Sequence, residues 1–443
     1  MAKIVMLGAG STVFTKNIIG DIMLKPSLSD CHIALYDIDT KRLKESAVIL
    51  QTLNKSINHS RAKITTHLGK KSRKSAFKNA DYFINAVQIG GYESTLIDFE
   101  IPKKYGLRQT IADTVGIGGI FRALRTAPVL LDFAKDIEFL CPDALFINYC
   151  NPMAILTGVM LKATDVKTVG LCHSVQTCVP RLLKGLKMKS LKKISWNIAG
   201  INHMSWLLEI SADGKDIYPE IKKRAAKMNQ QARKPGGKKH DNMVRFELMR
   251  NFGYYVTESS EHSAEYSPYW IKNQFPELVE EFNIPLDAYL RRLSDNSKSW
   301  DREYSELLKK TKISHKRSDE YRSFIIEAME TGKVQSFHGN ILNTGLITNL
   351  PSDAIVEVPC LVDRSGIKGC FVGDLPQQCA ALNRTNINVQ LLTTEAILTG
   401  KKDYIYQAAM LDPHTASELT IDKIHSMCDD LIEAHGDMID KFK

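Results

Sequence analysis

The first half of the chain alternates between two hydrophobic periodicities. Short runs rich in β-branched residues, typical of buried strands, are separated by longer stretches with apolar residues every three or four positions, typical of amphipathic helices. The predicted strands are residues 3–7, 33–37, 64–67, 81–87, 144–148 and 168–171. The predicted helices are residues 12–24, 41–58 and 119–139. This alternation predicts an α/β fold with a doubly wound, Rossmann-like parallel sheet.

After residue 172 the alternation loosens. An apolar stretch at 206–210 precedes a lysine-rich segment at 222–239, in which Gly236-Gly237 predicts a mobile loop. Residues 386–443 have the periodicity of two or more helices. We therefore predict two domains: a nucleotide-binding domain at 1–172 and a mixed α+β domain at 173–443 that carries the substrate and metal contacts.

Composition narrows the class of protein. With 443 residues, of which 44% are apolar, the chain can bury a large core. No stretch approaches the roughly 20 apolar residues of a membrane span, and Met1 leads into the first strand without a signal-peptide layout, so we expect a cytoplasmic protein without membrane contacts. Nine cysteines, none in a CxxC pair, argue against a disulfide framework and a structural zinc cluster.

The formal net charge of +9 could indicate a polyanionic partner. The basic excess is local, because the runs between Glu45 and Asp81 and between Glu220 and Asp241 each hold eight basic residues and no acidic one. Neither run is interleaved with aromatic residues of the kind that stack on bases. We interpret both as solvated basic faces and expect no nucleic-acid partner.

Gly8 and Gly10 follow the first predicted strand directly and precede a predicted helix. In dinucleotide-binding folds the pyrophosphate binds at this place, against the N-terminus of the helix. Gly8 permits the tight turn, Gly10 lets the backbone approach the phosphates, and Ser11 or Thr12 can cap the helix and offer a hydroxyl. The third glycine of the usual fingerprint is absent. Asp37, which ends the next predicted strand, is placed to bind a ribose 2′-hydroxyl and to repel a 2′-phosphate, which favours NAD over NADP.

Three polar clusters follow predicted strands, at the carboxyl edge where open α/β sheets bind ligands. They are Asn151-Pro152 after residues 145–148, Cys172-His173 after residues 168–171, and Asn202-His203 after a further predicted strand at residues 198–201. A thiolate and an imidazole are competent ligands for one divalent metal, with substrate oxygens or water at the open positions. Cys172 and His203 are the predicted metal ligands. Ligand softness alone favours zinc or iron.

Several of these segments, in this order, carry a family resemblance. They are Gly8 to Thr12, Gln88-Ile89-Gly90-Gly91-Tyr92-Glu93, Asp113-Thr114 before Gly116-Ile117-Gly118-Gly119, Asn148-Tyr149-Cys150-Asn151-Pro152-Met153-Ala154, Gly170-Leu171-Cys172-His173-Ser174 and Gly200-Ile201-Asn202-His203-Met204. Together they resemble glycoside hydrolase family 4, the NAD-dependent exception among glycosidases. The likeness runs nearly end to end and implies a lactate/malate dehydrogenase-like first domain.

Within this family the chain is most similar to the bacterial melibiose-cleaving α-galactosidases. The segments that carry this closer likeness are Glu258-Ser259-Ser260-Glu261-His262, Ala264-Glu265-Tyr266, Leu361-Val362-Asp363, Asn386-Ile387-Asn388 and residues 410–414. The resemblance implies elimination and addition in place of direct displacement: NAD oxidises the C3 hydroxyl, a base removes the C2 hydrogen, the C1–O bond breaks, water adds and NADH returns the hydride. It also implies Mn²⁺ as the metal and a homodimer or homotetramer.

The resemblance further implies roles for single residues. His173 corresponds to the general acid and Asn151 to a substrate contact. Tyr266 matches the C2 base of relatives, and Asp113 matches an acidic residue that sharpens the basicity of that tyrosine. Because a tyrosine ordinarily titrates near 10, the metal and neighbouring groups have to lower its pKa, and Glu265 or another nearby carboxylate remains an alternative base.

The substrate predicted in this way is an unphosphorylated α-galactoside. Relatives that act on 6-phosphosugars carry an arginine shortly after the Gly-Gly motif, whereas here no arginine lies between Gly91 and Arg108, and Glu93 would repel a phosphate. An α-glucosidase or α-glucuronidase of the same family is the first alternative. An NAD-dependent 2-hydroxy-acid dehydrogenase, which needs no Cys172/His203 metal pair, and a catalytically silent sugar sensor are the others.

Overall fold

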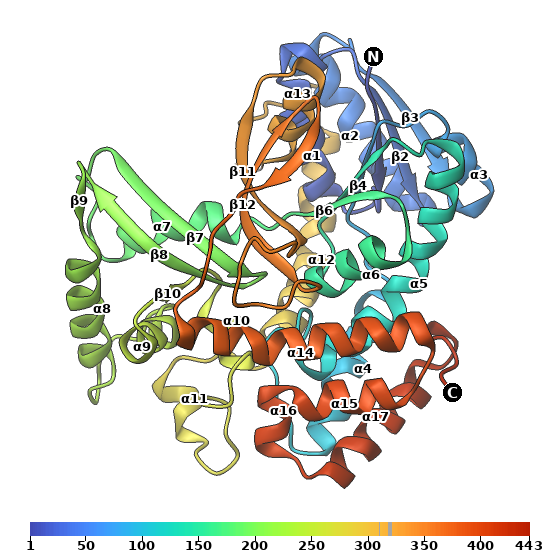
Figure 1. Cartoon of the computed structure of the whole chain (residues 1–443). Helices are drawn as coiled ribbons and strands as arrows, with labels where there is room; N and C mark the ends of the chain where they lie inside the picture. Colours follow the sequence, from blue (N-terminus) through green and yellow to red (C-terminus); the bar gives the residue numbers. More distant parts are fainter. Residues whose placement is uncertain (310, 318–320) are drawn as a thin grey trace.

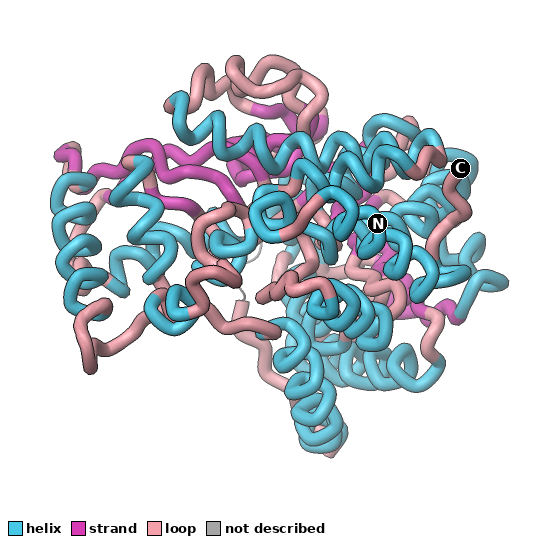
Figure 2. The backbone as a smooth tube through the Cα atoms, turned by 90° about the horizontal axis from the view of Figure 1, so that it is seen from below, coloured by secondary structure: helices cyan, strands magenta, loops and turns pink. Residues whose placement is uncertain are grey.

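The computed structural model describes residues 1–309, 311–317 and 321–443, with only the backbone at residues 12, 296–303, 308 and 322. Its strands are β1 (Lys3–Leu7), β2 (His32–Asp37), β3 (Lys63–Leu68), β4 (Tyr82–Asn85), β5 (Leu145–Asn148), β6 (Lys167–Gly170), β7 (Ile194–Ile201), β8 (Met204–Ala212), β9 (Lys215–Asp216), β10 (Tyr255–Val256), β11 (Gln335–Leu342), β12 (Ile355–Asp363) and β13 (Gly366–Gly369). In these ranges all thirteen strands form one sheet, in the order β10-β8-β7-β12-β11-β6-β5-β4-β1-β2-β3, with β13 beside β12 and β9 beside β8 (Figures 1 and 2).

The strands β3-β2-β1-β4-β5-β6 are parallel neighbours, which is the order of a dinucleotide-binding sheet. The predicted doubly wound sheet is therefore confirmed. Every residue of β4 and β5 is buried, as expected for strands covered by helices on both faces. The strand predicted at 81–87 is shorter, because the chain leaves the sheet after Asn85 to reach the left-handed turn at Gly90 and Gly91.

The helices of the chain lie on both faces of this sheet and in the second half of the chain. They are α1 (Thr12–Met23), α2 (Thr40–Asn58), α3 (Gly69–Phe77), α4 (Gly91–Lys104), α5 (Gly116–Leu140), α6 (Met153–Ala163), α7 (Ser174–Gly185), α8 (Tyr218–Ala232), α9 (Met243–Phe252), α10 (Ser260–Glu265), α11 (Glu277–Glu281), α12 (Ala288–Leu308), α13 (Arg322–Thr331), α14 (Gln377–Thr399), α15 (Asp403–Leu411), α16 (Pro413–Glu418) and α17 (Ile421–His435). Alternate residues of β1 point to opposite faces: Ile4 and Met6 pack with α1 and α2, whereas Val5 and Leu7 pack with α5 and α6.

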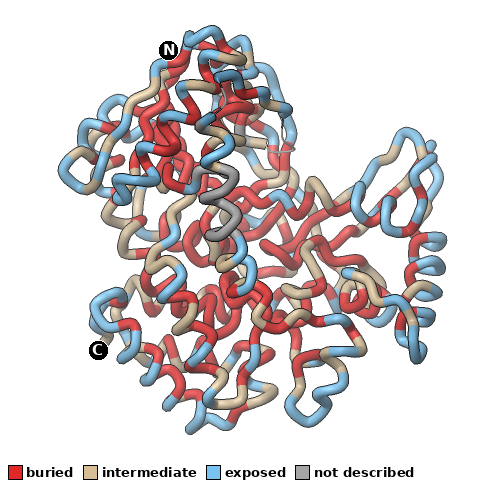
Figure 3. Tube along the Cα trace, turned by 180° about the vertical axis from the view of Figure 1, so that it is seen from behind, coloured by how far each residue is buried: buried red, intermediate tan, exposed pale blue. Residues whose placement is uncertain are grey.

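The second half extends the same sheet and does not start a separate one. The antiparallel pair β11–β12 adds to the edge strand β6, and the hairpin β7–β8 adds to β12. The helix α14 packs back on α5 and α6 of the first half. The hairpin and α8 project as an arm whose outer parts are exposed (Figures 1 and 3).

The lysine-rich segment is mostly helical. Residues 222–232 belong to α8, whose basic side chains Lys222, Lys223, Arg224 and Lys227 are exposed, and the loop with Gly236 and Gly237 occupies the residues that follow. The tail contains α14 to α17, which confirms the prediction of two or more helices. Among the described residues, no helix combines the length and the apolar character needed to cross a bilayer.

One buried ion network joins α4, α5 and the last long helix, α17. Arg125 donates to both carboxylate oxygens of Asp98, at 3.0 and 2.6 Å, and His435 Nε2 lies 2.9 Å from Asp98 Oδ1. Asp98 and Arg125 are 1% and 2% exposed. Removing the carboxylate charge leaves a guanidinium buried without a counter-ion, which is costly in a medium of low polarity.

We therefore expect Asp98→Asn to lower the free energy of unfolding by about 3 kcal/mol or more. Urea unfolding followed by circular dichroism measures this change. The matched control is Glu220→Gln, which removes an exposed i,i+4 pair with Arg224 and should leave the unfolding curve in place. An Asp98→Asn curve that coincides with the wild-type curve would contradict this view of the network.

Candidate active site

The glycine turn after β1 has the geometry of a phosphate-binding cradle. Gly8 is left-handed, with φ of +76°, and a Cβ on it would lie 2.7 Å from the Ala86 carbonyl oxygen. A Cβ on Gly10 would lie 2.8 Å from Asp37 Oδ2. Both positions therefore require glycine, because a side chain at either would collide with its neighbours.

Asp37 lies directly against this turn. Its Oδ2 accepts the Gly10 N–H at 2.6 Å and its Oδ1 accepts the Asp39 N–H at 2.9 Å, so the carboxylate is oriented at the end of β2. Ser11 occupies the N-cap position of α1, but its side chain makes no capping hydrogen bond in the part of the chain that the structure describes. The side chain of Thr12 lies outside the described residues.

Three possible metal-ligating side chains converge at the carboxyl edge of the sheet. Cys172 follows β6, His203 lies in the turn between β7 and β8, and Glu258 lies between β10 and α10. One ligand atom from each lies within 4.8 Å of the others. Sulfur, imidazole nitrogen and carboxylate oxygen together are a donor set that fits a divalent transition metal.

The backbone at His203 is unusual. Ile201 pairs with Met204, so Asn202 and His203 form a two-residue hairpin turn, and His203 is left-handed with φ of +62°. Its Nδ1 lies 3.2 Å from Thr114 Oγ1 and 3.1 Å from Tyr266 Oη, whereas its Nε2 lies 3.8 Å from Glu258 Oε2. Nε2 therefore faces the cluster, and the contacts at Nδ1 hold the ring in place.

Burial and charge tune the protonation of these three groups. Burial lowers the pKa of His203 to about 4, so the imidazole is neutral and available to a metal. Burial raises the pKa of Glu258, but His203, His262 and the Ser259 N–H outweigh it and bring the value to about 2. Burial, followed by the charges of Glu357 and Glu258, raises the pKa of the Cys172 thiol well above its usual value, so a bound cation would have to displace the thiol proton.

Asp113 connects this cluster to the Asn151-Pro152 loop. Its Oδ2 accepts from Asn151 Nδ2 at 3.1 Å and its Oδ1 accepts from Thr114 Oγ1 at 2.7 Å, while Arg122 Nε donates to the Asn151 carbonyl at 3.1 Å. Burial raises the pKa of Asp113, but Arg122 and then His262 and His203 lower it below the usual value. The carboxylate is therefore ionised and holds the side chain of Asn151.

Tyr266 is buried next to His203, with only 2% of its surface exposed. Burial and then the charge of Asp113 raise its pKa well above 10. The expectation that neighbouring side chains lower this pKa is therefore wrong, because burial and the nearby carboxylates Asp113, Glu265 and Glu258 all favour the neutral phenol and outweigh the hydrogen bond with Thr114. The sequence analysis named two factors that could lower this pKa, the metal and the neighbouring groups. Of these, only a metal cation remains able to favour the phenolate.

Glu265, the alternative base, is engaged elsewhere. Its carboxylate accepts backbone N–H bonds from Thr110, Ile111 and Ala112. Burial, opposed by His262 and these amides, raises its pKa to about 7. The side chain thus anchors the loop before Asp113 and points its oxygens away from solvent.

The structure thus brings five of the sequence-predicted residues into one contiguous network. They are Cys172, His203, Tyr266, Asp113 and Asn151. His173, at the start of α7, is exposed at the edge of this network. The glycine turn lies at the same sheet edge, with β4 and β5 between β1 and β6.

Sequence reasoning missed roles for two members of the cluster. Glu258 is a third possible ligand, and His262 Nε2 lies 4.0 Å from Asp113 Oδ1 while its Nδ1 lies 4.0 Å from Glu258 Oε1. Both belong to the segment from Glu258 to His262 that carried the family likeness, and that was the available signal. Asn202, 1% exposed, has no hydrogen-bond partner for either side-chain polar atom among the described residues.

A hollow lies elsewhere, on the arm. A cavity of about 620 Å³ is lined by residues of β7, β8 and α8 and by Tyr254. None of the predicted site residues lines it. The chemistry is therefore assigned from the side chains at the sheet edge and not from the size of this cavity.

Family models match both halves of the chain: "Family 4 glycosyl hydrolase" over residues 3–188 and "Family 4 glycosyl hydrolase C-terminal domain" over residues 198–415. An α-galactosidase of Bacillus subtilis (strain 168) is 58% identical over 444 residues, covering 100% of both chains. The chain belongs to glycosyl hydrolase family 4. The resemblance seen in the sequence motifs is thereby confirmed, and the dehydrogenase alternative no longer applies.

Solved structures confirm the predicted fold. A 6-phospho-α-glucosidase from gut microorganisms, in complex with NAD and Mn²⁺, superposes with a TM-score of 0.82 at 20% identity, covering 100% of both chains. Malate dehydrogenase from Plasmodium falciparum in complex with NADH has a TM-score of 0.50 at 15% identity, covering 91% of this chain and 100% of that one. The dehydrogenase-like first domain was therefore predicted correctly.

Proposed function

We propose that this family 4 glycosyl hydrolase is an α-galactosidase that requires NAD and a divalent metal and acts on unphosphorylated α-galactosides such as melibiose. The observation that carries the proposal is the convergence of Cys172, His203 and Glu258 within 4.8 Å at the sheet edge. Full-length likeness to an α-galactosidase supports the choice of sugar. An α-glucosidase or α-glucuronidase with the same cofactors is the remaining alternative.

NAD fits the turn between β1 and α1. The backbone at Gly8 and Gly10 and the first turn of α1 would hold the pyrophosphate, and Asp37 would bind the ribose hydroxyls. The Cβ positions at both glycines are occupied by neighbouring atoms, so the backbone is the surface presented to the phosphates. Bound there, NAD supplies a hydride acceptor that is regenerated in each turnover.

A divalent metal fits the second cluster. Cys172, His203 and Glu258 would hold it and leave positions for sugar oxygens. Mn²⁺ is the proposed ion, with other divalent ions as substitutes, since the mixed S, N and O donor set does not select one metal. Bound there, the ion supplies Lewis-acid stabilisation of negative charge on the C2 and C3 oxygens.

The remaining residues bind substrate and move protons. As a phenolate, Tyr266 would take the C2 proton, and the ionised Asp113 beside it makes that phenolate a stronger base. His173, exposed at the start of α7, gives a proton to the leaving-group oxygen. Asn151, whose amide nitrogen is held by Asp113, presents its carbonyl oxygen to a sugar hydroxyl, and the unpaired side chain of Asn202 is placed to bind another.

Charge argues against a phosphorylated sugar. Glu93 lies in the first turn of α4, directly after the Gly90-Gly91 turn, and no arginine occurs between this turn and Arg108. The Glu93 carboxylate would repel a dianionic phosphate, whereas a hexoside without a net charge would not be repelled by this carboxylate.

We also propose that the protein works in the cytoplasm as a homo-oligomer. All nine cysteines are free, and a reduced compartment keeps the Cys172 thiol available. The arm exposes Trp196, which is 42% accessible, and so offers a surface to another subunit. Sedimentation equilibrium measures the number of subunits.

The experiment that tests the proposed function is hydrolysis of p-nitrophenyl α-galactoside under reducing conditions. Activity is measured with NAD and Mn²⁺ together and then with each withheld after dialysis against a chelator. Activity that needs both supports the proposal, and activity that needs neither refutes the mechanism. Turnover of the matching α-glucoside or α-glucuronide, with the α-galactoside inert, would retain the mechanism and replace the sugar.

A further inference from the structure

A row of buried residues crosses the sheet just behind the proposed metal ligands. Paired in register across β6, β11, β12, β7 and β8, its members are Gly170, Asn340, Glu357, Gly200 and Ser205. Cys172 lies two residues beyond the first of them and His203 three residues beyond Gly200. The two ligand-bearing segments thus leave the sheet from the same row.

Side chains of this row form a chain of hydrogen bonds. Asn340 Nδ2 donates to the Gly170 carbonyl at 3.4 Å and to Glu357 Oε1 at 3.2 Å. Ser205 Oγ lies 2.9 Å from Glu357 Oε2 and 3.0 Å from the Ile201 carbonyl oxygen. Asn340, Glu357 and Ser205 are each 0% exposed, so water cannot replace these bonds. The chain connects the backbone before Cys172 with the backbone before the Asn202-His203 turn.

The two glycines make this chain possible. Gly200 stands between Glu357 and Ser205 in the row, and a Cβ on it would lie 2.7 Å from both the Met204 carbonyl oxygen and Ser205 Cα. Glu357 reaches across β7 to Ser205 because the residue between them has no side chain. At the other end, a Cβ on Gly170 would lie 3.0 Å from Asn340 Cβ.

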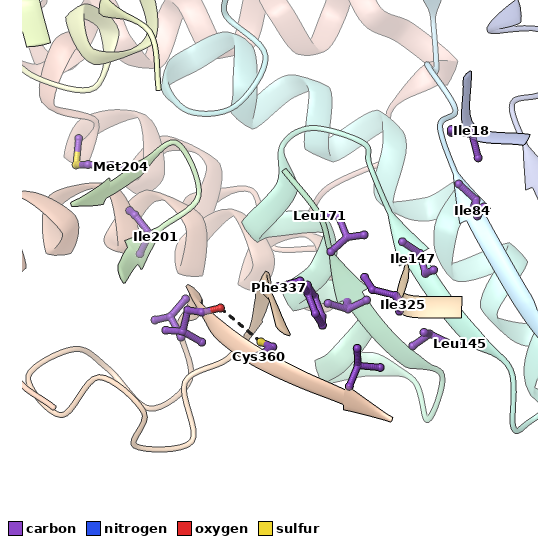
Figure 4. Close-up of a cluster of buried hydrophobic side chains, with 14 of the residues drawn as sticks. Ile18, Ile84, Leu145, Ile147, Leu171, Ile201, Met204, Ile325, Phe337 and Cys360 are labelled. Carbon is purple, nitrogen blue, oxygen red and sulfur yellow. Dashed lines mark hydrogen bonds between the residues drawn. The ribbon is translucent and has the colours of Figure 1, made fainter. Parts of the chain in front are cut away.

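The strands that carry this row are joined to the inserted pair β11–β12 by few backbone pairings. In the described residues, β6 pairs with β11 only at Gly170 and Asn340, and β7 pairs with β12 only at Gly200 and Glu357. By contrast, β11 and β12 pair along their whole length. Figure 4 labels Phe337 of β11 and Cys360 of β12, which pair with each other, and also Leu171 and Ile201, which lie next to the segments of Cys172 and His203.

The distance between strands β6 and β7 is large compared with the distances between the proposed ligand atoms. Three strand spacings, or roughly 14 Å, separate β6 from β7 at this row. The ligand atoms themselves lie within 4.8 Å of one another. A small shift of β6 or β7 relative to the inserted pair would therefore separate the thiol of Cys172 from the ring of His203.

We propose that the side chains of Asn340, Glu357 and Ser205 are positioning residues that set the spacing between Cys172 and His203 for metal binding. They act through the strands and do not touch the substrate. The inference rests on the proposed metal site, because it assigns a function to residues behind that site.

The test measures metal binding and not turnover. Chelator-treated protein in a phosphine reductant is titrated with Co²⁺, and the thiolate-to-cobalt absorption reports a bond to Cys172. Calorimetry with Mn²⁺ gives a dissociation constant. Glu357→Ala and Ser205→Ala should each weaken the binding of Co²⁺ and Mn²⁺ by about tenfold or more and reduce the thiolate-to-cobalt absorption. Changes to residues that support metal ligands usually have effects of this size.

Two matched variants separate positioning from general destabilisation. Glu357→Gln should bind metal almost as wild type does, because its amide donates to Ser205 Oγ and its carbonyl accepts from Asn340. Val358→Ala removes a neighbouring core side chain, also 0% exposed, from the opposite face of β12. It should lower the unfolding midpoint without changing the metal dissociation constant.

Each outcome decides the question. Wild-type metal affinity in Glu357→Ala and Ser205→Ala, or an equal loss in Val358→Ala, overturns the inference. If Glu357→Ala does not fold, Ser205→Ala decides, since it removes one hydroxyl only. A wild-type protein that binds neither metal refutes the proposed metal site and this inference with it, whereas normal binding in every variant refutes this inference alone.

Discussion

Cys172→Ala should lower kcat/KM for p-nitrophenyl α-galactoside by about a thousandfold or more, because the metal loses its sulfur ligand and with it several kcal/mol of stabilisation of charge on the sugar oxygens. His203 and Glu258 alone would provide only two protein ligands. NAD affinity should remain at the wild-type value, since the glycine turn lies after β1 and not after β6. Activity, bound metal and NAD binding by fluorescence are measured on the same preparation.

The matched control for this variant is Cys178→Ala. Cys178 lies six residues further along the chain, in α7, is 2% exposed and packs in a hydrophobic cluster with residues of β7 and β8. Its removal should cost some stability but leave metal content and kcat/KM unchanged. A Cys172→Ala enzyme that keeps full activity and its metal would show that this thiol is not a ligand.

Tyr266→Phe should lower kcat by about a hundredfold or more, the usual contribution of a positioned proton acceptor. The expected loss follows from the absence of a phenolic oxygen 3.1 Å from His203 Nδ1, beside the ionised Asp113. Exchange of the C2 hydrogen of the sugar with deuterium from D₂O, followed by NMR, should stop in the variant. The unfolding midpoint should move little, because the ring and its packing remain.

This residue also contacts a proposed metal ligand, so the experiment has to separate proton transfer from metal binding. If Tyr266 acts only by holding the His203 ring, the variant has a raised dissociation constant for Mn²⁺ and regains kcat at saturating metal. If it is the C2 base, saturating metal restores nothing. Tyr255→Phe is the control, because Tyr255 is also buried and lies outside the cluster, and its hydroxyl donates to Asn242 Oδ1 at 3.0 Å.

Much of the first domain could be predicted because its signals are local. The strand–glycine–helix pattern around Gly8 and Gly10 appears as predicted, and so do all six parallel strands within a few residues. The helices α3, α4 and α6 were not predicted. Short helices such as α3, with its run of basic residues, have weak periodicity, and their position depends on packing against the sheet.

The site was predicted in part for the same reason. Cys172 and His203 follow predicted strands, so their arrival at one sheet edge could be expected. Glu258 follows the two-residue strand β10, which has no periodicity to detect, and it reaches the cluster only because β10 pairs with β8 beside the His203 turn. The pKa of Tyr266 could not be anticipated either, since its direction depends on which carboxylates surround the buried ring.

The sequence by itself determined the parallel sheet, the glycine turn after the first strand and two of the three residues proposed to hold the metal, because each depends on neighbours in the chain or on a motif of fixed spacing. Only the tertiary structure decided that β11 and β12 stand between β6 and β7 and that Asn340, Glu357 and Ser205 form one buried row. The pairings of β11 with β6 and of β12 with β7 join residues more than a hundred positions apart. Their register is selected by the fit of side chains across the whole sheet, for which no local pattern in the chain exists.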